Sequence, residues 1–458
     1  MKAYIKTYGC QMNERDSEAL GGMLIARGWS LTDDESTAQL LIFNTCSVRE
    51  QAERKALGKI MHMKKLKRHN ESLMIGVIGC MAQRLGEELF TELPHIDFVL
   101  GTGQLHELPD LVESLWEDRR HRALLENSEA VLTGMGQHNY TSPTIFGQVA
   151  ITRGCNRFCS YCIVPYVRGR EMSRAQEDII AEITELAAHG VREVMLLGQN
   201  VAAYGLNGII TPPADDHSPF AELLRAAAQV PGIARIRFTS PYPSYFNGTL
   251  INAIAETPKV ARMIHLPLQS GSNRVLAAMN RQYTAELYLE ITERIKAAIP
   301  GVCFSTDIIV GFPGETEEDF NATRTLMQQV GFDNAFIFKY SPRQGAKSAQ
   351  TEDSVPTEVK EQRNQILLAD LAERTLNHNR ALIGTTQEIL VEGTSFRNEA
   401  RWCGKTSTAK TVVFAPIPGV KPGDLISLKI AEATGMTLFA DNIPDLPNFA
   451  GLAGAFAP

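Results

Sequence analysis

The chain has 458 residues, of which 44% are hydrophobic and 21% charged, and its formal net charge is -7 at pH 7. At roughly 100 to 200 residues per domain, this length predicts two to four domains rather than a single core. No apolar run approaches the roughly 18 residues of a membrane span, and the first residues turn polar too early for a signal peptide. We therefore expect a cytoplasmic protein without membrane contact, and the acidic balance argues against an evenly basic nucleic-acid binder.

Three copies of one local pattern occupy the first third of the chain, at residues 2–28, 38–63 and 72–93. Each has a short apolar run that predicts a buried strand, followed by a segment with helical periodicity. Such βα units predict a parallel sheet with helices packed on it. A cysteine stands just after each predicted strand, at Cys10, Cys46 and Cys80. Because the carboxyl ends of parallel strands share one edge, this placement favours a metal site, although isolated cysteines also serve as small buried hydrophobes.

The rest of the chain divides at a polar, proline-containing stretch near residues 137–147. Beyond it, strands and helices alternate repeatedly, which predicts six parallel strands in a partial (β/α)6 barrel with its functional face at the strand carboxyl ends. A long amphipathic segment follows, and then short strands rich in Thr, Val and Gly predict a small all-β module, a sandwich or a barrel. The predicted fold class is thus α/β with an added β-module, and we expect domains at residues 1–140, 141–380 and 381–446, with a tail at 447–458.

Cys155, Cys159 and Cys162 form a second cysteine group within ITRGCNRFCSYCIVPYVRGRE, residues 151–171. Their spacing lets the three sulfurs approach one metal centre, but a closed tetrahedral zinc site or a ferredoxin-like cluster would need a fourth ligand. Cys303 and Cys403 could supply it only by long-range folding, and we expect Cys303 in the core and Cys403 to be incidental. A 4Fe-4S cluster held by three thiolates keeps one iron open to a small molecule, and it can deliver one electron.

These three cysteines, with the aromatic Tyr161 before the last, resemble the signature of the radical S-adenosylmethionine (SAM) enzymes. The resemblance implies that SAM binds the open iron and is cleaved reductively to methionine and a 5'-deoxyadenosyl radical. The order of an α/β domain with three spaced cysteines, a radical domain and a small β-module is similar to the methylthiotransferases. That family implies a second, auxiliary 4Fe-4S cluster on Cys10, Cys46 and Cys80, and a carboxyl-terminal TRAM module that binds RNA.

The contexts YGCQMNERDSE and NTCSVRE resemble the branch of this family that acts on N6-dimethylallyladenosine at position 37 of tRNA. The branch that modifies a ribosomal protein differs at both places, with LGCPKN and NTCGF. The resemblance implies transfer of a methylthio group to carbon 2 of that adenine, with one SAM as methyl donor and one as radical source. A methylthiotransferase acting on a ribosomal protein side chain, or a non-catalytic iron-sulfur protein that binds RNA, remain as alternatives.

Matching family stretches imply further site residues and partners. The residues implied to contact the SAM cofactor are Tyr161, Gln199, Asn200, Gln269, Arg281, Gly311 and Phe312. The glycines near Gly311 have a commoner role as turn formers. We predict RNA contact, mainly through phosphates, for Lys64, Lys65, Lys67, Arg153, Arg157, Arg168 and Arg170. The basic run at residues 54–69 can also be an ordinary solvated helix face. The expected partners are a tRNA anticodon stem-loop and an electron donor such as flavodoxin or ferredoxin.

Overall fold

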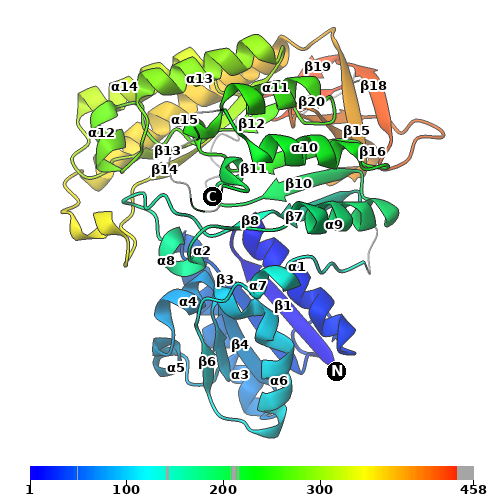
Figure 1. Ribbon diagram of the computed structural model, residues 1–458, viewed down its shortest axis with the longest axis vertical. Coiled ribbons are helices and arrows are strands. Elements are labelled where there is room, and N and C mark those ends of the chain that lie inside the picture. Colours follow the sequence, from blue (N-terminus) through cyan, green and yellow to red (C-terminus); the bar gives the residue numbers. More distant parts are fainter. Residues whose placement is uncertain (49, 141–143, 207, 209–212, 214–215, 441–458) are drawn as a thin grey trace.

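The computed structural model describes residues 1–48, 50–140, 144–206, 208, 213 and 216–440. Figure 1 shows an amino-terminal α/β domain, a central domain of strands and helices, and a carboxyl-terminal β-domain at the far side of the central one. The predicted fold class is confirmed. The predicted tail at 447–458 lies outside the described residues. Among the described helices, none combines the length and apolar composition needed to cross a membrane.

The amino-terminal domain is built on a parallel six-stranded sheet in the order β2-β1-β3-β4-β5-β6. Its strands are β1 (Lys2–Tyr8), β2 (Ser30–Leu31), β3 (Leu40–Thr45), β4 (Met74–Gly79), β5 (Phe98–Leu100) and β6 (Arg122–Leu124). Its helices are α1 (Gln11–Ala26), α2 (Glu50–His62), α3 (Lys64–His69), α4 (Cys80–Leu85), α5 (Glu88–Glu92), α6 (Leu108–Glu117), α7 (Val131–Gly134) and the 3-10 helix η1 (Thr102–Glu107). Every residue of β3 and β4 is buried, as expected for central strands covered on both faces.

The third predicted helix of this domain is broken in two. Gly86, with φ of 55°, ends α4, and α5 begins two residues later. A left-handed φ is costly for residues other than glycine, so the helix stops there. The short α4 places Cys80 in its first turn, directly against the end of β4.

The central domain contains six parallel strands, arranged as β11-β10-β7 and β12-β13-β14 and joined by a bridge between Ile236 and Val260. These strands are β7 (Phe146–Ala150), β10 (Glu193–Leu197), β11 (Arg235–Thr239), β12 (Met263–His265), β13 (Cys303–Val310) and β14 (Asn334–Lys339). The helices outside them are α9 (Gln176–Ala188), α10 (Pro219–Gln229), α11 (Gly248–Glu256), α12 (Asn273–Ala278), α13 (Ala285–Ala298), α14 (Glu317–Val330) and α15 (Thr357–Arg380). This arrangement is the predicted partial barrel.

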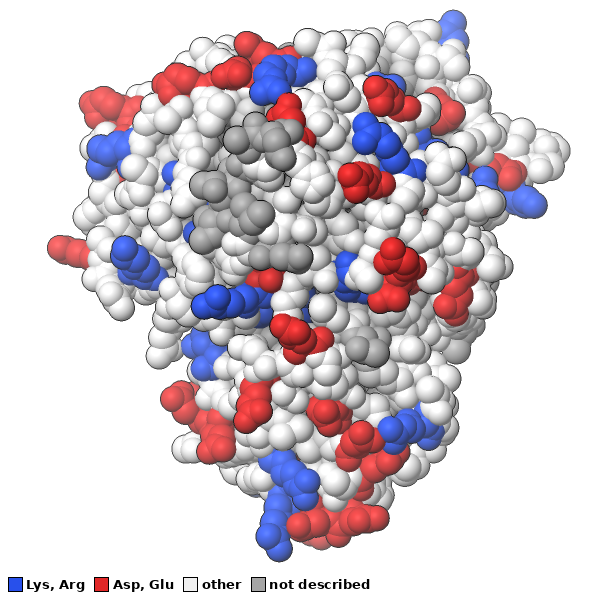
Figure 2. All heavy atoms as spheres, viewed as in Figure 1, with Lys and Arg blue, Asp and Glu red and all other residues white. Residues whose placement is uncertain are grey.

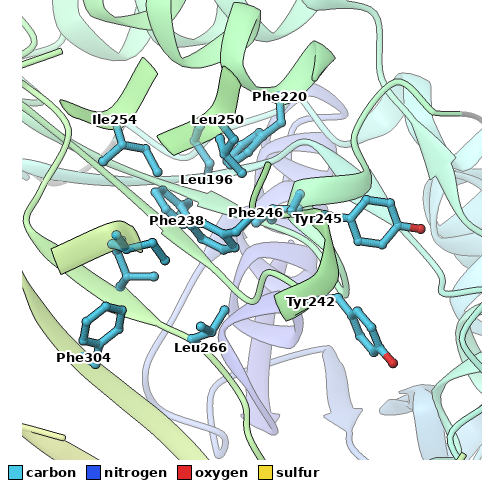
Figure 3. Packing of buried hydrophobic residues seen from close by; sticks show 14 of the residues in the cluster. Leu196, Phe220, Phe238, Tyr242, Tyr245, Phe246, Leu250, Ile254, Leu266 and Phe304 are labelled. Atoms are coloured by element: carbon cyan, nitrogen blue, oxygen red, sulfur yellow. The ribbon is translucent and has the colours of Figure 1, made fainter. Parts of the chain in front are cut away.

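Short elements complete this domain at the barrel's functional face. They are β8 (Thr152–Arg153), α8 (Val164–Arg168), β9 (Met172–Ser173) and the 3-10 helices η2 (Val201–Ala203), η3 (Pro243–Tyr245) and η4 (Lys347–Gln350). Figure 3 shows the core beneath them, where Leu196, Phe238 and Leu266 pack inside the helices, while the rings of Tyr242 and Tyr245 extend away from that core. The core therefore ends where the polar loops begin.

The carboxyl-terminal domain is one six-stranded sheet in the order β18-β15-β16-β17-β20-β19. Its strands are β15 (Thr386–Ser395), β16 (Asn398–Thr406), β17 (Thr411–Phe414), β18 (Leu425–Lys429), β19 (Glu432–Ala433) and β20 (Thr437–Phe439). It is fixed to the amino-terminal ends of the barrel strands by Glu193, which pairs at 3.3 Å with Arg235 and at 2.8 Å with Arg237. The two guanidiniums then donate to the backbone carbonyls of Lys405 and Thr406 at 2.8 and 2.9 Å. This domain thus lies at the end of the barrel opposite its functional face.

A buried ionic cluster joins the amino-terminal domain to the barrel. His138 donates or accepts at both ring nitrogens, with Nδ1 2.8 Å from Glu18 Oε1 and Nε2 2.7 Å from Glu182 Oε1. Arg15 lies 3.3 Å from Glu182, which also pairs with Arg174. Burial alone would lower the pKa of His138, but the hydrogen bonds to Glu18 and Glu182 raise it above its ordinary value.

Replacing His138 by Gln is expected to cost about 3 kcal/mol of unfolding free energy below pH 6, because it breaks a buried charged network. A histidine whose pKa is raised by folding contributes its full stabilisation below its unfolded pKa, near 6.5. That stabilisation is lost as the pH rises through the folded pKa. The difference in Tm between wild type and variant should therefore narrow from pH 6 to pH 9. The exposed His62, changed to Gln, provides the control; a difference that widens with pH would contradict the assignment.

Candidate metal centres

Cys10, Cys46 and Cys80 lie at the carboxyl ends of three adjacent strands, as predicted. In the register of the sheet, Tyr8 pairs with Thr45 and Thr45 with Gly79, so each cysteine follows the same row of paired residues. Cys46 and Cys80 are buried and Cys10 is exposed. The sequence therefore brings three thiols from three separate βα units to one edge of the sheet.

A polar network holds these three loops in place. The side chain of Asn13 donates to Asn44 Oδ1 at 2.9 Å and to the backbone carbonyl of Thr45 at 3.2 Å, and its own Oδ1 accepts from the Cys10 thiol at 3.3 Å. Gly79 has φ of 94°, and a Cβ there would lie 2.5 Å from the Asn44 oxygen. Only glycine permits this close approach of the third loop.

The second cysteine group lies on the loop between β8 and α8. Its first residues are fixed by Gln199, whose Oε1 accepts from the Gly154 N–H at 2.6 Å, and by the Cys155 N–H, which donates to the Gly169 carbonyl at 3.2 Å. Ser160 anchors the far side, since its N–H donates to the Met279 carbonyl and its hydroxyl to the Ala278 carbonyl. The loop that carries Cys155, Cys159 and Cys162 is thus tied to the barrel at both ends.

Replacing Gly154 by Ala is expected to empty this cysteine loop of metal. Gly154 has φ of 79°, and a Cβ would stand 2.1 Å from the backbone oxygen of Arg170. The left-handed backbone alone costs about 1–2 kcal/mol for a non-glycine residue, and the clash adds to it. Iron content measures the loss of metal, and urea unfolding measures the loss of stability. Gly28 has φ of 82° with nothing within 4 Å, so Gly28→Ala should show the backbone cost while keeping all the iron.

The donor sets fit 4Fe-4S clusters better than a single metal ion. All eight cysteines are free thiols. Within the described part of the chain, no three His, Cys, Asp or Glu side chains are grouped closely enough to hold one ion. In a cubane each thiolate binds a different iron, so three thiolates would hold three irons and leave the fourth open. Burial raises the pKa of Cys155 to about 11, and that of Cys162 also rises, so both need bound metal to ionise at neutral pH.

The two cysteine groups are neighbours across the domain boundary. Ile163 directly follows Cys162, and it packs with Val167 against Cys80. Figure 1 shows the corresponding helices, α8 of the central domain and α4 of the amino-terminal domain, one above the other at the junction. The Cα atoms of adjacent residues are only about 3.8 Å apart. Ile163 is therefore the single residue that links Cys162 of the second group to the thiol of Cys80 in the first.

Around the second group, several polar atoms are buried and have no hydrogen-bond partner among the residues that the structure describes. They are Thr152 Oγ1, Arg157 Nη2 and Asn200 Nδ2. The other end of Asn200 accepts from the Tyr242 N–H at 3.0 Å, so its free amide nitrogen is held in place. Because buried polar atoms rarely remain unpaired, these three fit a polar cofactor such as SAM bound beside the loop.

Arg281, on a loop distant in sequence, contacts a sulfur of this cysteine group. Its guanidinium is 3.5 Å from the Cys159 sulfur, donates to Tyr283 and to the Pro267 carbonyl at 2.9 and 3.0 Å, and stacks over the ring of Tyr242 at 4.3 Å. A cation in this position stabilises an anionic cluster. The contact is to a metal ligand, so we now propose that Arg281 acts on the cluster as well as on the cofactor.

The remaining predicted cofactor residues fall into two kinds. Tyr161 and Phe312 share one apolar group, and the Phe312 ring meets Tyr340 edge-on at 5.3 Å. Gln269 and Gly311 have backbone φ angles of 70° and 72°, and Gln269 forms an isolated bridge to Ile308 of β13. These positions shape the barrel's functional face, and their contact with SAM remains a proposal.

Three of the arginines predicted to bind RNA are instead buried in the protein. Arg153 and Arg168 both pair with Asp16, at 3.2 and 2.9 Å. Arg157 stacks on Tyr242 and Tyr245, with its guanidinium 4.1 and 4.7 Å from the ring centroids. Since phosphate contact needs accessible cations, the prediction for these three does not fit their burial, and we no longer propose it.

The remaining predicted RNA contacts lie on the surface at two different places. Arg170 is exposed next to the second cysteine loop. Lys64 and Lys65 are exposed on α3, which precedes β4 and so lies at the sheet edge opposite the cysteines. Lys67 forms a 2.7 Å ion pair with Asp97 and is structural. Of these four, Arg170 is the one adjacent to a metal centre.

Asp16 and Glu171 were not anticipated from the sequence. Asp16 lies six residues after Cys10 on α1, and its carboxylate receives both buried arginines. Glu171 lies near Cys155 and Arg157, and burial raises its pKa to about 7. The only sequence signal for Asp16 was an acidic residue in a predicted helix just after a cysteine, which is too common to single out.

Known families match the chain in three consecutive parts. The matching family models are the Uncharacterized protein family UPF0004 over residues 2–101, the Radical SAM superfamily over 149–327 and the TRAM domain over 380–443. Among solved structures, the radical SAM methyltransferase TsrM from Kitasatospora setae superimposes with a TM-score of 0.55 at 14% identity, covering 74% of this chain and 72% of its own. The fold and the cysteine loops therefore define a radical SAM protein with two added domains.

Closer relatives share nearly the whole length. A tRNA-2-methylthio-N(6)-dimethylallyladenosine synthase from Akkermansia muciniphila is 45% identical over 460 residues, covering 97% of this chain and 99% of the relative. One of the same name from Carboxydothermus hydrogenoformans is 46% identical over 433 residues, covering 94% and 96%. The chain belongs to this family of tRNA-2-methylthio-N(6)-dimethylallyladenosine synthases, and the predicted resemblance is confirmed.

Proposed function

We propose that this protein adds a methylthio group to carbon 2 of N6-(dimethylallyl)adenosine at position 37 of tRNA. It uses one SAM as methyl donor and one as radical source. The observation that carries the proposal is the contact of Ile163, next to Cys162, with Cys80, which makes the two cysteine groups neighbours. We propose the domain limits 1–140, 141–380 and 381–446, and helix α15 ends at Arg380.

Within this function the six cysteines hold two 4Fe-4S clusters. Cys155, Cys159 and Cys162 would hold the cluster that binds SAM, and the amino-terminal cysteines would hold the auxiliary one. When bound, the clusters and SAM supply reductive radical formation and the sulfur and methyl groups. Because reductive cleavage consumes an electron, we include a donor such as flavodoxin or ferredoxin in the proposal.

The chain's own residues bind and shield these groups. Asn200 and Arg157 offer unpaired N–H donors to the cofactor, and Arg281 provides a fixed cation at Cys159. Ile163 and Val167 form an apolar wall at Cys80. Excluding water protects a reactive radical from side reactions, which is the protein's main role in such chemistry.

The anticodon loop is proposed to approach at the second cysteine loop. Phe158 and Tyr166 there are 47% and 52% exposed, with ring centroids 6.0 Å apart. Exposed aromatic rings can stack on bases splayed from a single-stranded loop, as entry of adenine 37 requires. Figure 2 shows Lys and Arg interspersed with Asp and Glu on the viewed face, so local contacts of this kind would guide the RNA rather than a broad positive field.

Reversing the charge of Arg170 to Glu is expected to weaken tRNA binding more than Lys64→Glu, because Arg170 lies beside the cysteine loop and Lys64 at the opposite sheet edge. Loss of one phosphate contact should reduce the slope of log Kd against log salt by about 0.9. Filter binding over a salt series measures this. An equal or larger effect of Lys64→Glu would mean that helix α3, which carries Lys64, also contacts the RNA.

Nucleoside analysis of tRNA tests the function itself. A strain lacking this protein should lose 2-methylthio on dimethylallyladenosine and regain it when the chain is restored, but not with Cys80→Ala. Loss of a methylthio group from a ribosomal protein instead would favour the second methylthiotransferase activity. Unchanged modification of both would favour a non-catalytic iron-sulfur protein.

A further inference from the structure

Arg168 belongs to the radical SAM domain, yet its side chain lies at the amino-terminal cysteines. It is the last residue of α8, six positions after Cys162, and it is buried. Its Nη2 donates to Asp16 Oδ2 at 2.9 Å, across 152 residues of sequence. Asp16 stands on α1, the helix that directly follows Cys10. The ion pair therefore joins the helix after the second cysteine loop to the helix after Cys10.

The cluster of charges at this place is not balanced by the protein. Arg153 and Arg168 together carry two positive charges, and Asp16 carries one negative charge, which leaves one positive charge in excess. All three side chains are buried. Burying an unpaired charge is costly, so an anion is expected in contact with this group.

Arg168 has a second donor besides the one that pairs with Asp16. Its Nη1 is buried and has no hydrogen-bond partner within the described part of the chain. Burial would lower the pKa of Arg168, but the charges of Asp16, Cys80 and Cys10 raise it. Cys80 lies against the same helix through Ile163 and Val167. The excess charge thus lies at the end of the helix that packs on Cys80, one of the three proposed ligands of the auxiliary cluster.

We propose that Arg168 completes the auxiliary cluster from the neighbouring domain, by donating an N–H to a sulfur at the Cys80 and Cys10 side and by supplying its counter-charge. The proposal rests on the proposed function, since it requires a cluster on Cys10, Cys46 and Cys80. Hydrogen bonds and nearby charge set the reduction potential of iron-sulfur clusters. Arg168 favours the reduced, more negative state, and Asp16 moderates this effect while it orients the guanidinium.

The test uses the full chain with Cys155, Cys159 and Cys162 changed to Ala, so that only the auxiliary cluster loads. Its midpoint potential is measured by anaerobic redox titration followed by electron paramagnetic resonance. Arg168→Gln should shift the potential to more negative values, and Arg168→Lys should shift it less. Asp16→Asn, which keeps the shape of the side chain, should shift it in the opposite direction because it removes a negative charge.

Arg174→Gln is the matched control. Arg174 is also a buried arginine near the domain boundary, paired with Glu182, which Arg15 of the amino-terminal domain contacts as well, and its loss should leave the potential unchanged. Normal iron content with no shift in Arg168→Gln, or shifts of the same sign in Arg168→Gln and Asp16→Asn, would overturn the role of Arg168. If the parent variant held no iron at all, the proposed auxiliary cluster itself would be wrong, which is a distinguishable result.

Discussion

Changing Cys155, Cys159 and Cys162 together to Ala is expected to halve the iron of the reconstituted protein, from about eight to about four atoms per chain. Cleavage of SAM should fall below detection, because the only proposed site for the cofactor is removed. The loop is tied to the barrel through Gly154 and Ser160, so the fold should survive the change. Iron and sulfide assays, with chromatography of 5'-deoxyadenosine, measure both effects.

Cys303 and Cys403 provide the control for this experiment. Cys303 begins β13, at the barrel end that faces the TRAM domain, and Cys403 lies within the TRAM strand β16. Changing both to Ala should leave iron content and SAM cleavage as in the wild type. Residual SAM cleavage in the triple variant would mean that the cofactor binds elsewhere.

Changing Cys10, Cys46 and Cys80 to Ala should abolish the methylthio product while leaving SAM cleavage in place. About half the iron is again lost, but SAM should still be cleaved, because the second loop is held by its own contacts with the barrel. No methylthio product should form, since the sulfur source is absent. Product analysis of dimethylallyladenosine-containing tRNA measures this. Continued sulfur insertion would mean that Cys10, Cys46 and Cys80 take no part in the reaction.

The sequence predicted the amino-terminal domain well where a strand pattern and a cysteine at its end occur together. The three βα units and the common edge of Cys10, Cys46 and Cys80 followed from strand-like runs of six or seven residues, each with a cysteine after it. The prediction that all three strands are buried is confirmed for β3 and β4 but wrong for β1, in which Ala3 alone is buried. The flanking strands β2, β5 and β6 were not predicted, because two or three residues carry no periodic signal. They join the sheet through pairing with longer neighbours.

The arginines near the cysteine loop show what sequence cannot supply. Arg153 and Arg168 appeared as surface charges suited to RNA, but their partner Asp16 lies 137 and 152 residues away. Arg157 is likewise buried by Tyr242 and Tyr245 of a distant loop. Charge is visible in a sequence, whereas burial depends on contacts made only in the fold. The same limit applies to Lys67, which Asp97 neutralises.

The attachment of the TRAM domain has a consequence for the choice of substrate. The buried ion pairs of Glu193 with Arg235 and Arg237 fix that domain at the amino-terminal ends of the barrel strands, while both cysteine groups lie at the other end. At about 3.3 Å per residue, the eight-residue β13 separates these two ends by roughly 26 Å. If the TRAM domain binds RNA, as the family resemblance implies, one tRNA would have to reach both ends, and we expect an oligonucleotide too short to bridge that interval to be a poor substrate even when it carries the correct base.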